Sequence, residues 1–331
     1  MVQTDYHAVS KLILAYPERF YNGYDELVPF YDELLSLIPN DFETWVVTNN
    51  NQSIKKLEEK FAHKKMNFLG LKGWDDIWLR DCIGIIKGDY VIKPEYSPNY
   101  CASGNSREYF RKINGLSRII IKECLNKEIV QLNLKLDGGN FVCNNEFAFI
   151  TDKIMDQNGI YSMKEITAVL RETVELRPII IERNKCDVIG HTDAYINFID
   201  KKRVLISNYP SFPFLKDDID FINQLDEELK IAGIERIVFY DRPIDEAAQC
   251  LCKSKNRKPC FYSARGNYIN FLRINNLIIL PEYNLSSKRE SNYYNKKNQE
   301  ILENLGFEVK RINCDTLAKF GGVLHCISFL A

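Results

Sequence analysis

Five polar residues of types that take part in enzyme chemistry recur along the chain at regular spacing. They are separated by 56, 56, 77 and 56 residues, and each stands at the head of an apolar segment. The five are Asp81, Asp137, Asp193, Asn270 and Cys326. A period of this length is typical of a structural unit that is repeated, as in propellers and arrays. The spacing therefore predicts five units that each deliver a polar side chain to a shared centre.

Carboxylates in this set suit the recognition of a guanidinium group. A guanidinium offers five donors in a rigid planar fork and stays charged at physiological pH. We expect Asp81 and Asp193 to bind its two edges. Trp78, three residues before Asp81, is a candidate for an aromatic wall beside the cation, and Asp76 is a further substrate-binding candidate. Taken singly, an aspartate is more often a turn or cap residue, and a tryptophan is more often a core residue.

A thiol and an imidazole could supply a nucleophile and an acid–base group that act on the bound guanidinium. A thiolate beside an imidazolium is a common nucleophile at neutral pH, which makes Cys326 a candidate, although most cysteines are buried and inert. His191 would protonate the departing nitrogen and then activate water, if a carboxylate orients its other ring nitrogen. We assign that role to Asp137. The two glycines after it permit close backbone approach, but an ordinary turn is the alternative.

The segments that must position these residues are predicted to be hairpins followed by helices. Turn residues interrupt β-rich runs in four places, which indicates hairpins. These are residues 82–94, 141–151, 195–207 and 268–281. Apolar residues at spacings of three and four predict helices between them. These are Tyr24 to Ile38, Gln52 to Phe61, Ser162 to Val174, Lys216 to Ala232 and Lys296 to Leu305.

Each unit is predicted to end in a further strand, such as Pro178 to Ile181 or Arg236 to Tyr240. The interval of 77 residues carries about 21 more than the others, and we place them in a loop insertion near residues 243–264, where the chain is polar and basic. Evenly spaced hairpins also occur in α/β proteins without a repeat, so that interpretation stays open.

Composition excludes several classes of partner. The 331 residues include 44 basic and 45 acidic side chains, which are scattered and provide no net field to attract nucleic acid or an anionic membrane. The apolar run Leu12 to Tyr16 is too short for a signal-peptide core, and no later stretch approaches the roughly twenty apolar residues that span a bilayer. We predict a soluble, cytoplasmic protein, and a homo-oligomer is compatible with the sequence.

Cysteine and histidine usage argues against metal chemistry. Ten cysteines in a long chain without an export signal favour free thiols over a disulfide scaffold. The tightest group, Cys250, Cys252 and Cys260, lacks the Cys-x-x-Cys pairing and nearby histidine of zinc sites. With four histidines in all, we expect neither a metal nor a cofactor.

Taken together and in order, these motifs resemble the agmatine deiminase and bacterial peptidylarginine deiminase family of guanidino-group modifying enzymes. The resemblance extends from about Leu12 to Ala331. Its segments are residues 78–81, 137–140, 190–193, 268–271 with 280–283, and 321–326. It implies the pentein fold, a five-bladed pseudo-symmetric α/β propeller of five ββαβ-type units around a central active site. The whole chain, 1–331, would be a single catalytic domain.

The resemblance also implies a metal-free hydrolysis in two stages. Cys326 attacks the guanidinium carbon, ammonia leaves with a proton from His191, and water splits the thiouronium intermediate to give a ureido product. By the family pattern Asp81 and Asp193 bind the guanidinium nitrogens. Asn270 would lie near the nucleophile, and we include Asn140, from the Asp137 motif, among the substrate-binding candidates.

Three departures bear on the substrate. Asp137 stands where agmatine deiminases usually carry Glu, Ile327-Ser328-Phe329 replaces Ile-Thr-Gln, and the N-terminal Pro-x-Glu-Trp/Phe segment is absent. We expect conversion of agmatine to N-carbamoylputrescine and ammonia, as in polyamine biosynthesis. The alternative is a peptidylarginine or free-arginine deiminase that gives citrulline, with Arg107 or Arg111 meeting the substrate carboxylate. An amidinotransferase of the same fold and a non-catalytic guanidine-binding protein are further alternatives.

Overall fold

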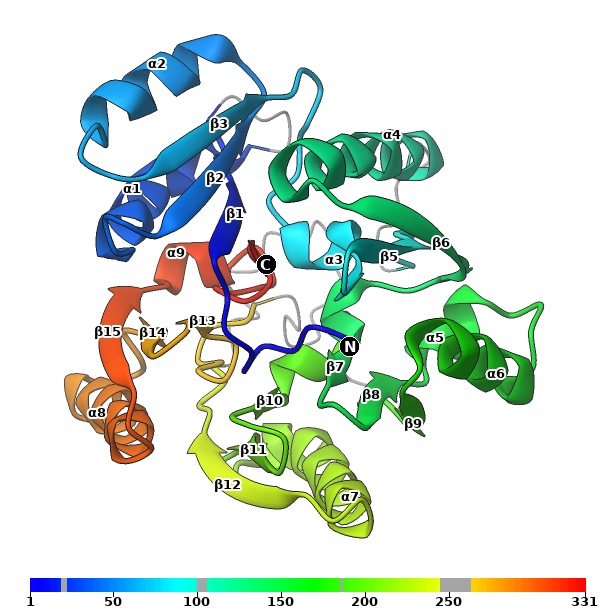
Figure 1. Cartoon of the computed structure of the whole chain (residues 1–331). Helices are drawn as coiled ribbons and strands as arrows, with labels where there is room; N and C mark the ends of the chain where they lie inside the picture. Colours follow the sequence, from blue (N-terminus) through cyan, green and yellow to red (C-terminus); the bar gives the residue numbers. More distant parts are fainter. Residues whose placement is uncertain (19–22, 100–105, 185–186, 245–262) are drawn as a thin grey trace.

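The computed structural model describes residues 1–18, 23–99, 106–184, 187–244 and 263–331. Within these ranges the chain is a mixed α/β protein whose strands form five small sheets. Figure 1 shows the sheets arranged around the middle of the molecule, with the longer helices outside them. Four sheets repeat one pattern, in which an antiparallel pair of strands is followed by a third strand parallel to the second.

The strands of these four sheets follow one another in chain order. They are β4 (Ile85–Lys87), β5 (Tyr90–Glu95) and β6 (Glu128–Lys135); β7 (Val142–Cys143), β8 (Phe147–Thr151) and β9 (Arg177–Ile181); β10 (Ile196–Phe198), β11 (Arg203–Asn208) and β12 (Glu235–Tyr240); and β13 (Leu272–Ile274), β14 (Leu277–Glu282) and β15 (Glu308–Asn313).

The fifth sheet joins the two ends of the chain. Strand β16 (Ser328–Leu330) pairs antiparallel with β1 (Lys11–Ala15), with Leu330 opposite Leu12. Parallel pairing then adds β2 (Glu43–Thr48) and β3 (Met66–Gly70). Because β16 begins two residues after Cys326, this sheet fixes the position of the candidate nucleophile.

Helices connect the parallel strands, because two parallel neighbours need a crossover connection. They are η1 (Tyr24–Leu27), α1 (Val28–Leu37), α2 (Asn51–Lys60), α4 (Ser106–Ile120) with η2 (Ile121–Leu125), α5 (Lys153–Gln157), α6 (Met163–Val174), η5 (Pro213–Leu215), α7 (Lys216–Ile231) and α8 (Lys288–Asn304). Ser162 begins α6 through a capping box with Glu165. Strand β8 is buried along its whole length, as expected for a strand covered on both faces.

Shorter helices stand between the hairpins and the middle of the molecule. They are α3 (Leu79–Ile83), η3 (Gly138–Asn140), η4 (Thr192–Ala194) and α9 (Asp315–Ala318). Helix α3 contacts η3, and η3 contacts η4, so three of these segments form a continuous lining.

The structure confirms the four predicted hairpins and the five predicted helices, except that the hairpin predicted from Tyr268 begins at Leu272 and that two further corrections apply. Cys82, predicted to begin a strand, is in α3, and α8 begins at Lys288 rather than Lys296, because Ser287 accepts a hydrogen bond from the backbone N–H of Glu290. Helix α4 was not predicted. Most of the predicted insertion near 243–264, with Cys250, Cys252 and Cys260, lies outside the described residues. Among the described helices none is long and apolar enough to cross a membrane, and the cytoplasmic location stays a prediction.

Candidate active site

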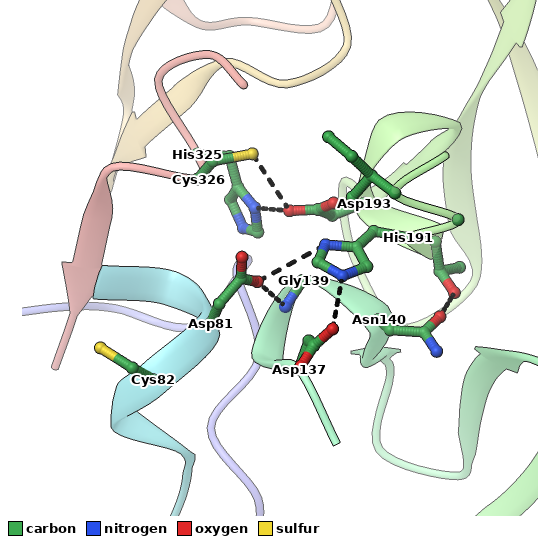
Figure 2. Close-up of polar contacts among 12 residues, drawn as sticks. Asp81, Cys82, Asp137, Gly139, Asn140, His191, Asp193, His325 and Cys326 are labelled. Atoms are coloured by element: carbon green, nitrogen blue, oxygen red, sulfur yellow. Dashed lines mark hydrogen bonds and ion pairs between the residues drawn. The ribbon is translucent and has the colours of Figure 1, made fainter. Parts of the chain in front are cut away.

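The five regularly spaced residues each lie two to five positions before the first strand of a sheet. Asp81 is in α3, Asp137 precedes η3, and Asp193 is in η4, whereas Asn270 and Cys326 precede β13 and β16. Their elements meet in the middle of the molecule, and Figure 2 shows Asp81, Asp137, Asp193 and Cys326 gathered around His191. The repeated spacing therefore identified residues that are close in space.

A cavity of about 150 Å³ opens at this point. Its inner lining includes His191, Asp193, Asn270 and Cys326. Gly139 marks where the polar atoms converge. A Cβ atom on this glycine would lie 2.7 Å from His191 Nδ1, 2.9 Å from Asp81 Oδ1 and 3.1 Å from Asp193 Oδ1. His191, Asp81 and Asp193 thus approach the Gly139 backbone more closely than a side chain at this position would allow.

Cys326 is partly exposed to the cavity, and its contacts are polar. Its Sγ lies 3.3 Å from Asn270 Oδ1 and 3.9 Å from Asp193 Oδ2, and its backbone N–H also donates to Asn270 Oδ1 at 3.3 Å. Burial and the nearby carboxylates of Asp193 and Asp81 raise the pKa of the Cys326 thiol well above its usual value. Without a ligand the thiol is therefore protonated at neutral pH, and a cation placed between the carboxylates would favour the thiolate.

Behind Asp193 a second histidine links the site to the N-terminal segment. His325 Nδ1 lies 2.8 Å from Asp193 Oδ2, and its Nε2 lies 3.2 Å from Asp5 Oδ1. Arg80 Nη2 is 3.4 Å from the same Asp5 oxygen. Burial and Arg80 lower the pKa of His325, but Asp5 and Asp193 raise it, and the net direction is upward. A charged His325 stabilises the carboxylate of Asp193.

His191 has a carboxylate on each side. Its Nδ1 lies 3.5 Å from Asp81 Oδ1, and its Nε2 lies 3.1 Å from Asp137 Oδ2, the orienting contact predicted for Asp137. Burial and Lys153 lower the pKa of His191, whereas Asp81 and Asp137 raise it, and the net shift is upward. Asp81 also accepts from the Gly139 N–H at 2.9 Å, and its pKa is raised by burial and by the neighbouring carboxylates.

Sequence reasoning missed Lys153, which is buried against this histidine. Its Nζ donates to Asp137 Oδ2 at 2.7 Å and lies 3.0 Å from His191 Nε2. Burial would raise the pKa of Asp137, but Lys153 and His191 hold it well below its usual range. The carboxylate of Asp137 is therefore ionised. A lysine at the start of a short helix after a strand gives no local signal of this role.

Trp78 and Asp76 are joined by a hydrogen bond just before α3. Asp76 accepts hydrogen bonds from the Trp78 backbone N–H and the Tyr109 hydroxyl, both at 3.0 Å, and burial raises its pKa to about 6. The Trp78 ring lies over Gly322, where a Cβ would come within 2.4 Å of it. Trp78 is thus beside the Cys326 loop, and Asp76 holds its backbone rather than lining the cavity.

Asn140, the remaining substrate-binding candidate, is also a supporting residue. Its Oδ1 accepts from the Thr151 N–H at 2.9 Å and from the Thr192 hydroxyl at 3.0 Å. The side chain is fully buried and does not line the cavity. Asn140 therefore links η3 to β8 and η4, which keeps Gly139 and Asp193 close to each other.

The rest of the cavity combines apolar and acidic side chains. Asp187 and Asp218 line it together with Tyr195, whose hydroxyl donates to Asp187 Oδ2 at 2.7 Å. Burial and the Asp187 charge raise the pKa of Asp218 to about 6. Arg265 also lines the cavity, and its Nε lies 2.8 Å from Asp315 Oδ1. The candidates Arg107 and Arg111 are exposed on α4 and line no part of this cavity.

Comparison with known proteins places this geometry in a family. The model of the Porphyromonas-type peptidyl-arginine deiminase family matches residues 1–330. No curated protein sequence matches the chain.

Solved structures resemble it over nearly the whole length. The agmatine deiminase of C. jejuni is 19% identical, with a TM-score of 0.74, over 100% of this chain and 96% of that one. The agmatine deiminase of Enterococcus faecalis is 15% identical, with a TM-score of 0.74, over 99% and 94%. DDAH of Pseudomonas aeruginosa, in complex with citrulline, is 11% identical, with a TM-score of 0.54, over 98% and 100%. At such identities the likeness concerns the fold, and it is the family model that shows membership: the chain belongs to the Porphyromonas-type peptidyl-arginine deiminase family.

Proposed function

We propose that the protein is a hydrolytic deiminase that acts on the guanidino group of a small substrate through a covalent intermediate on Cys326. One observation carries this proposal: Asp81, Asp193 and His191 Nδ1 converge beside Gly139, and Asp193 also contacts the Cys326 thiol. Family membership supports the reaction class. The five sheets would be the blades of one propeller and the whole chain one catalytic domain.

In the first stage the guanidinium binds between Asp81 and Asp193. Its positive charge offsets the two carboxylates that hold the Cys326 thiol protonated, and the thiol proton passes to His191. The thiolate forms a C–S bond to the guanidinium carbon, while the electron pair of one C–N bond moves to nitrogen. That nitrogen takes the proton from the His191 imidazolium and leaves as ammonia. A thiouronium cation remains on Cys326.

In the second stage His191 takes a proton from water, and the resulting hydroxide forms a C–O bond to the same carbon. The C–S bond then breaks, and the hydroxyl proton of the adduct returns to the departing sulfur. This releases the ureido product and regenerates the thiol. The proton left on His191 passes to solvent, where it converts ammonia to ammonium.

The acidic residues in the outer cavity favour a substrate with a second cation. Asp187 and Asp218 share this space with apolar side chains, and the pKa of Asp218 is raised by burial and by the neighbouring charge of Asp187. An ammonium group would relieve their repulsion. Agmatine carries a guanidinium and an ammonium joined by a short apolar chain, so its conversion to N-carbamoylputrescine, a step of polyamine biosynthesis, is the reaction we favour.

The same cavity contains the feature that favours the alternative. Arg265 is a cation that a substrate carboxylate could meet, as free arginine would require for deimination to citrulline. Its ion pair with Asp315 competes with that role. A peptide arginine has neither the ammonium nor the free carboxylate, and none of the described residues that line the cavity favours it over agmatine.

Ammonia release from purified protein tests the proposal, with agmatine, arginine and a peptide containing internal arginine as substrates. We expect release and a ureido product from agmatine, and no turnover by folded Cys326→Ala. Ornithine or glycine would be added in parallel, because transfer of the amidino group to either would identify an amidinotransferase. Binding of agmatine without any ammonia from the wild-type protein would indicate a binding protein and refute the deiminase.

A further inference from the structure

A buried ammonium group lies directly behind the candidate acid–base residue. The Lys153 side chain is 1% exposed, at the first position of α5. Its Nζ donates to Asp137 Oδ2 and to the Ile189 carbonyl, each at 2.7 Å, and lies 3.0 Å from His191 Nε2. Burying a lysine is costly unless it is paired, so this ammonium is held at a defined place by two strong acceptors.

The geometry assigns the two ring nitrogens different tasks. His191 Nε2 lies 3.1 Å from Asp137 Oδ2, and this contact is satisfied when Nε2 carries a hydrogen. Nδ1 lies beside Gly139 and 3.5 Å from Asp81 Oδ1, on the side of the proposed guanidinium site, so it is the nitrogen that gives and takes protons. A fixed Nε2–H that donates to Asp137 keeps the ring in one orientation through both stages.

The difficulty for this arrangement is an excess of negative charge. Five ionisable groups of the described residues lie around His191. They are Asp81 from α3, Asp137 from the segment before η3, Asp193 from η4, Cys326 from its loop and Lys153 from α5. Three of these five are carboxylates, which favour the imidazolium. A histidine that holds its proton too tightly can neither release it to the leaving nitrogen nor accept one from water. Lys153 is the one cation in this described group.

We propose that Lys153 is a positioning residue that fixes the carboxylate of Asp137 and, as a cation beside Nε2, keeps the proton affinity of His191 low enough for both proton transfers. This inference rests on the proposed deiminase function and adds to it a residue that does not touch the substrate. It also explains why a lysine is buried here, since an apolar residue would leave the Asp137 charge without its strongest partner.

Gln157 offers a matched control, because it contacts the same carboxylate without carrying charge. Its Nε2 donates to Asp137 Oδ1 at 3.1 Å. Replacing Lys153 by methionine removes a cation together with its hydrogen bonds to Asp137 and the Ile189 carbonyl, whereas Gln157→Leu removes hydrogen bonds to Asp137 and the Ser97 carbonyl without any change of charge. A purely structural role for Lys153 predicts similar consequences for both changes. The proposal predicts that only Lys153→Met alters the titration of His191.

The experiment has two readouts on the full chain. The first is NMR titration of the imidazole signals, which is tractable with four histidines and is assigned with His191→Gln. The second is the pH dependence of kcat and KM for ammonia release from agmatine. For Lys153→Met we expect the midpoint of the His191 titration to rise by about one pH unit, a tenfold change in proton affinity. The pH at which kcat falls on the alkaline side should rise by the same amount, and KM should change little. Lys153→Arg should restore the titration while lowering kcat, since charge is kept but geometry is not.

Several results would overturn the inference. One is an unchanged His191 titration in folded Lys153→Met; another is an equal shift in Gln157→Leu. If Lys153→Met does not fold, the double variant Lys153→Met with Asp137→Asn is compared with Asp137→Asn alone. These two differ only in the lysine, so His191 should titrate higher in the double variant, and an equal or lower titration contradicts the proposal. Because the titration needs no substrate, its failure is distinct from a failure of the wild-type protein to release ammonia, which would refute the deiminase function instead.

Discussion

His325 Nδ1 lies 2.8 Å from Asp193 Oδ2, so the residue directly before Cys326 holds the carboxylate that faces the Cys326 thiol. The opposite ring nitrogen lies 3.2 Å from Asp5 Oδ1. A buried carboxylate without partners would be costly, and this contact satisfies Asp193 before any substrate arrives. The relay from Asp5 through His325 to Asp193 therefore connects the first residues of the chain to the proposed substrate site.

Replacing His325 should weaken substrate binding. In His325→Asn the charged partner of Asp193 is lost, and we expect kcat/KM for agmatine to fall about 10- to 100-fold, since a hydrogen bond to a charged group contributes roughly 1.5–3 kcal/mol. Steady-state kinetics should show most of the loss in KM. Asp5→Asn, one contact further from the cavity, should have the smaller effect. A loss confined to kcat would contradict this role of the relay.

The same contacts predict how stability depends on pH. The pKa of His325 is raised in the folded protein, since Asp5 and Asp193 outweigh burial and Arg80. The charged histidine therefore contributes stability that is fully present below about pH 6.5, its unfolded pKa, and is lost as pH rises through the folded pKa. Urea denaturation between pH 6 and pH 9 should show the wild-type advantage over His325→Gln shrinking with pH. An advantage that grows with pH would refute this assignment.

Cys326 should react slowly with alkylating agents in the absence of substrate. Burial and the carboxylates of Asp193 and Asp81 raise the pKa of its thiol, so little thiolate exists at pH 7. We expect Asp193→Asn to increase the rate of iodoacetamide labelling several-fold, and the wild-type rate to rise steeply with pH. Mass spectrometry of the peptide that contains Cys326 follows this residue alone. Fast, pH-independent labelling of the wild-type protein would show a thiolate already formed.

Gly139 should tolerate no side chain. In Gly139→Ala the new Cβ would lie 2.7 Å from His191 Nδ1 and 2.9 Å from Asp81 Oδ1, so residues proposed to act on the guanidinium would have to move. We predict a loss of activity of about 100-fold or more, as for other small displacements of reacting groups. Gly115→Ala is the control, because a Cβ there meets nothing within 4 Å. Circular dichroism verifies that both variants are folded, and comparable activity of the two would contradict the placement of the substrate.

The acidic outer cavity should discriminate between substrates. Asp218→Asn removes one of the two carboxylates proposed to meet the substrate ammonium, so KM for agmatine should rise roughly tenfold. Arginine, which brings a carboxylate of its own, should be affected less or should bind better. The ratio of kcat/KM for the two substrates measures this effect directly. An equal change for both would place Asp218 outside the substrate contact.

The sequence predicted the hairpins and the shared centre well, because both depend on local signals. Turn residues between β-rich runs indicated each hairpin, and the constant spacing indicated that Asp81, Asp137 and Asp193 lie close together. Helix α4 was missed although Phe110 and Ile113 follow helical spacing. Its Asn114-Gly115 pair is typical of a turn. In the structure the Asn114 side chain instead binds the Tyr96 backbone, a tertiary contact that overrides the local preference.

The missed parts of the site depend on contacts between distant segments. Lys153 meets His191 across 38 residues, and Asp5 meets His325 across 320. Neither lysine nor aspartate stands out in its local sequence, and their roles appear only when β8 and the N-terminal segment are packed beside the centre. Asp76 and Asn140 are likewise buried, and their side chains accept hydrogen bonds from backbone N–H groups instead of lining the cavity.

Trapping the intermediate on Cys326 tests the central claim most directly. Protein quenched with acid during turnover of agmatine would be digested and its peptides measured by mass spectrometry, with His191→Gln included to slow the second stage. We predict an adduct with the mass of agmatine less ammonia on the peptide containing Cys326, lost in Cys326→Ala together with ammonia release. Ammonia release by Cys326→Ala at the wild-type rate, with no adduct on the wild-type protein, would contradict the account.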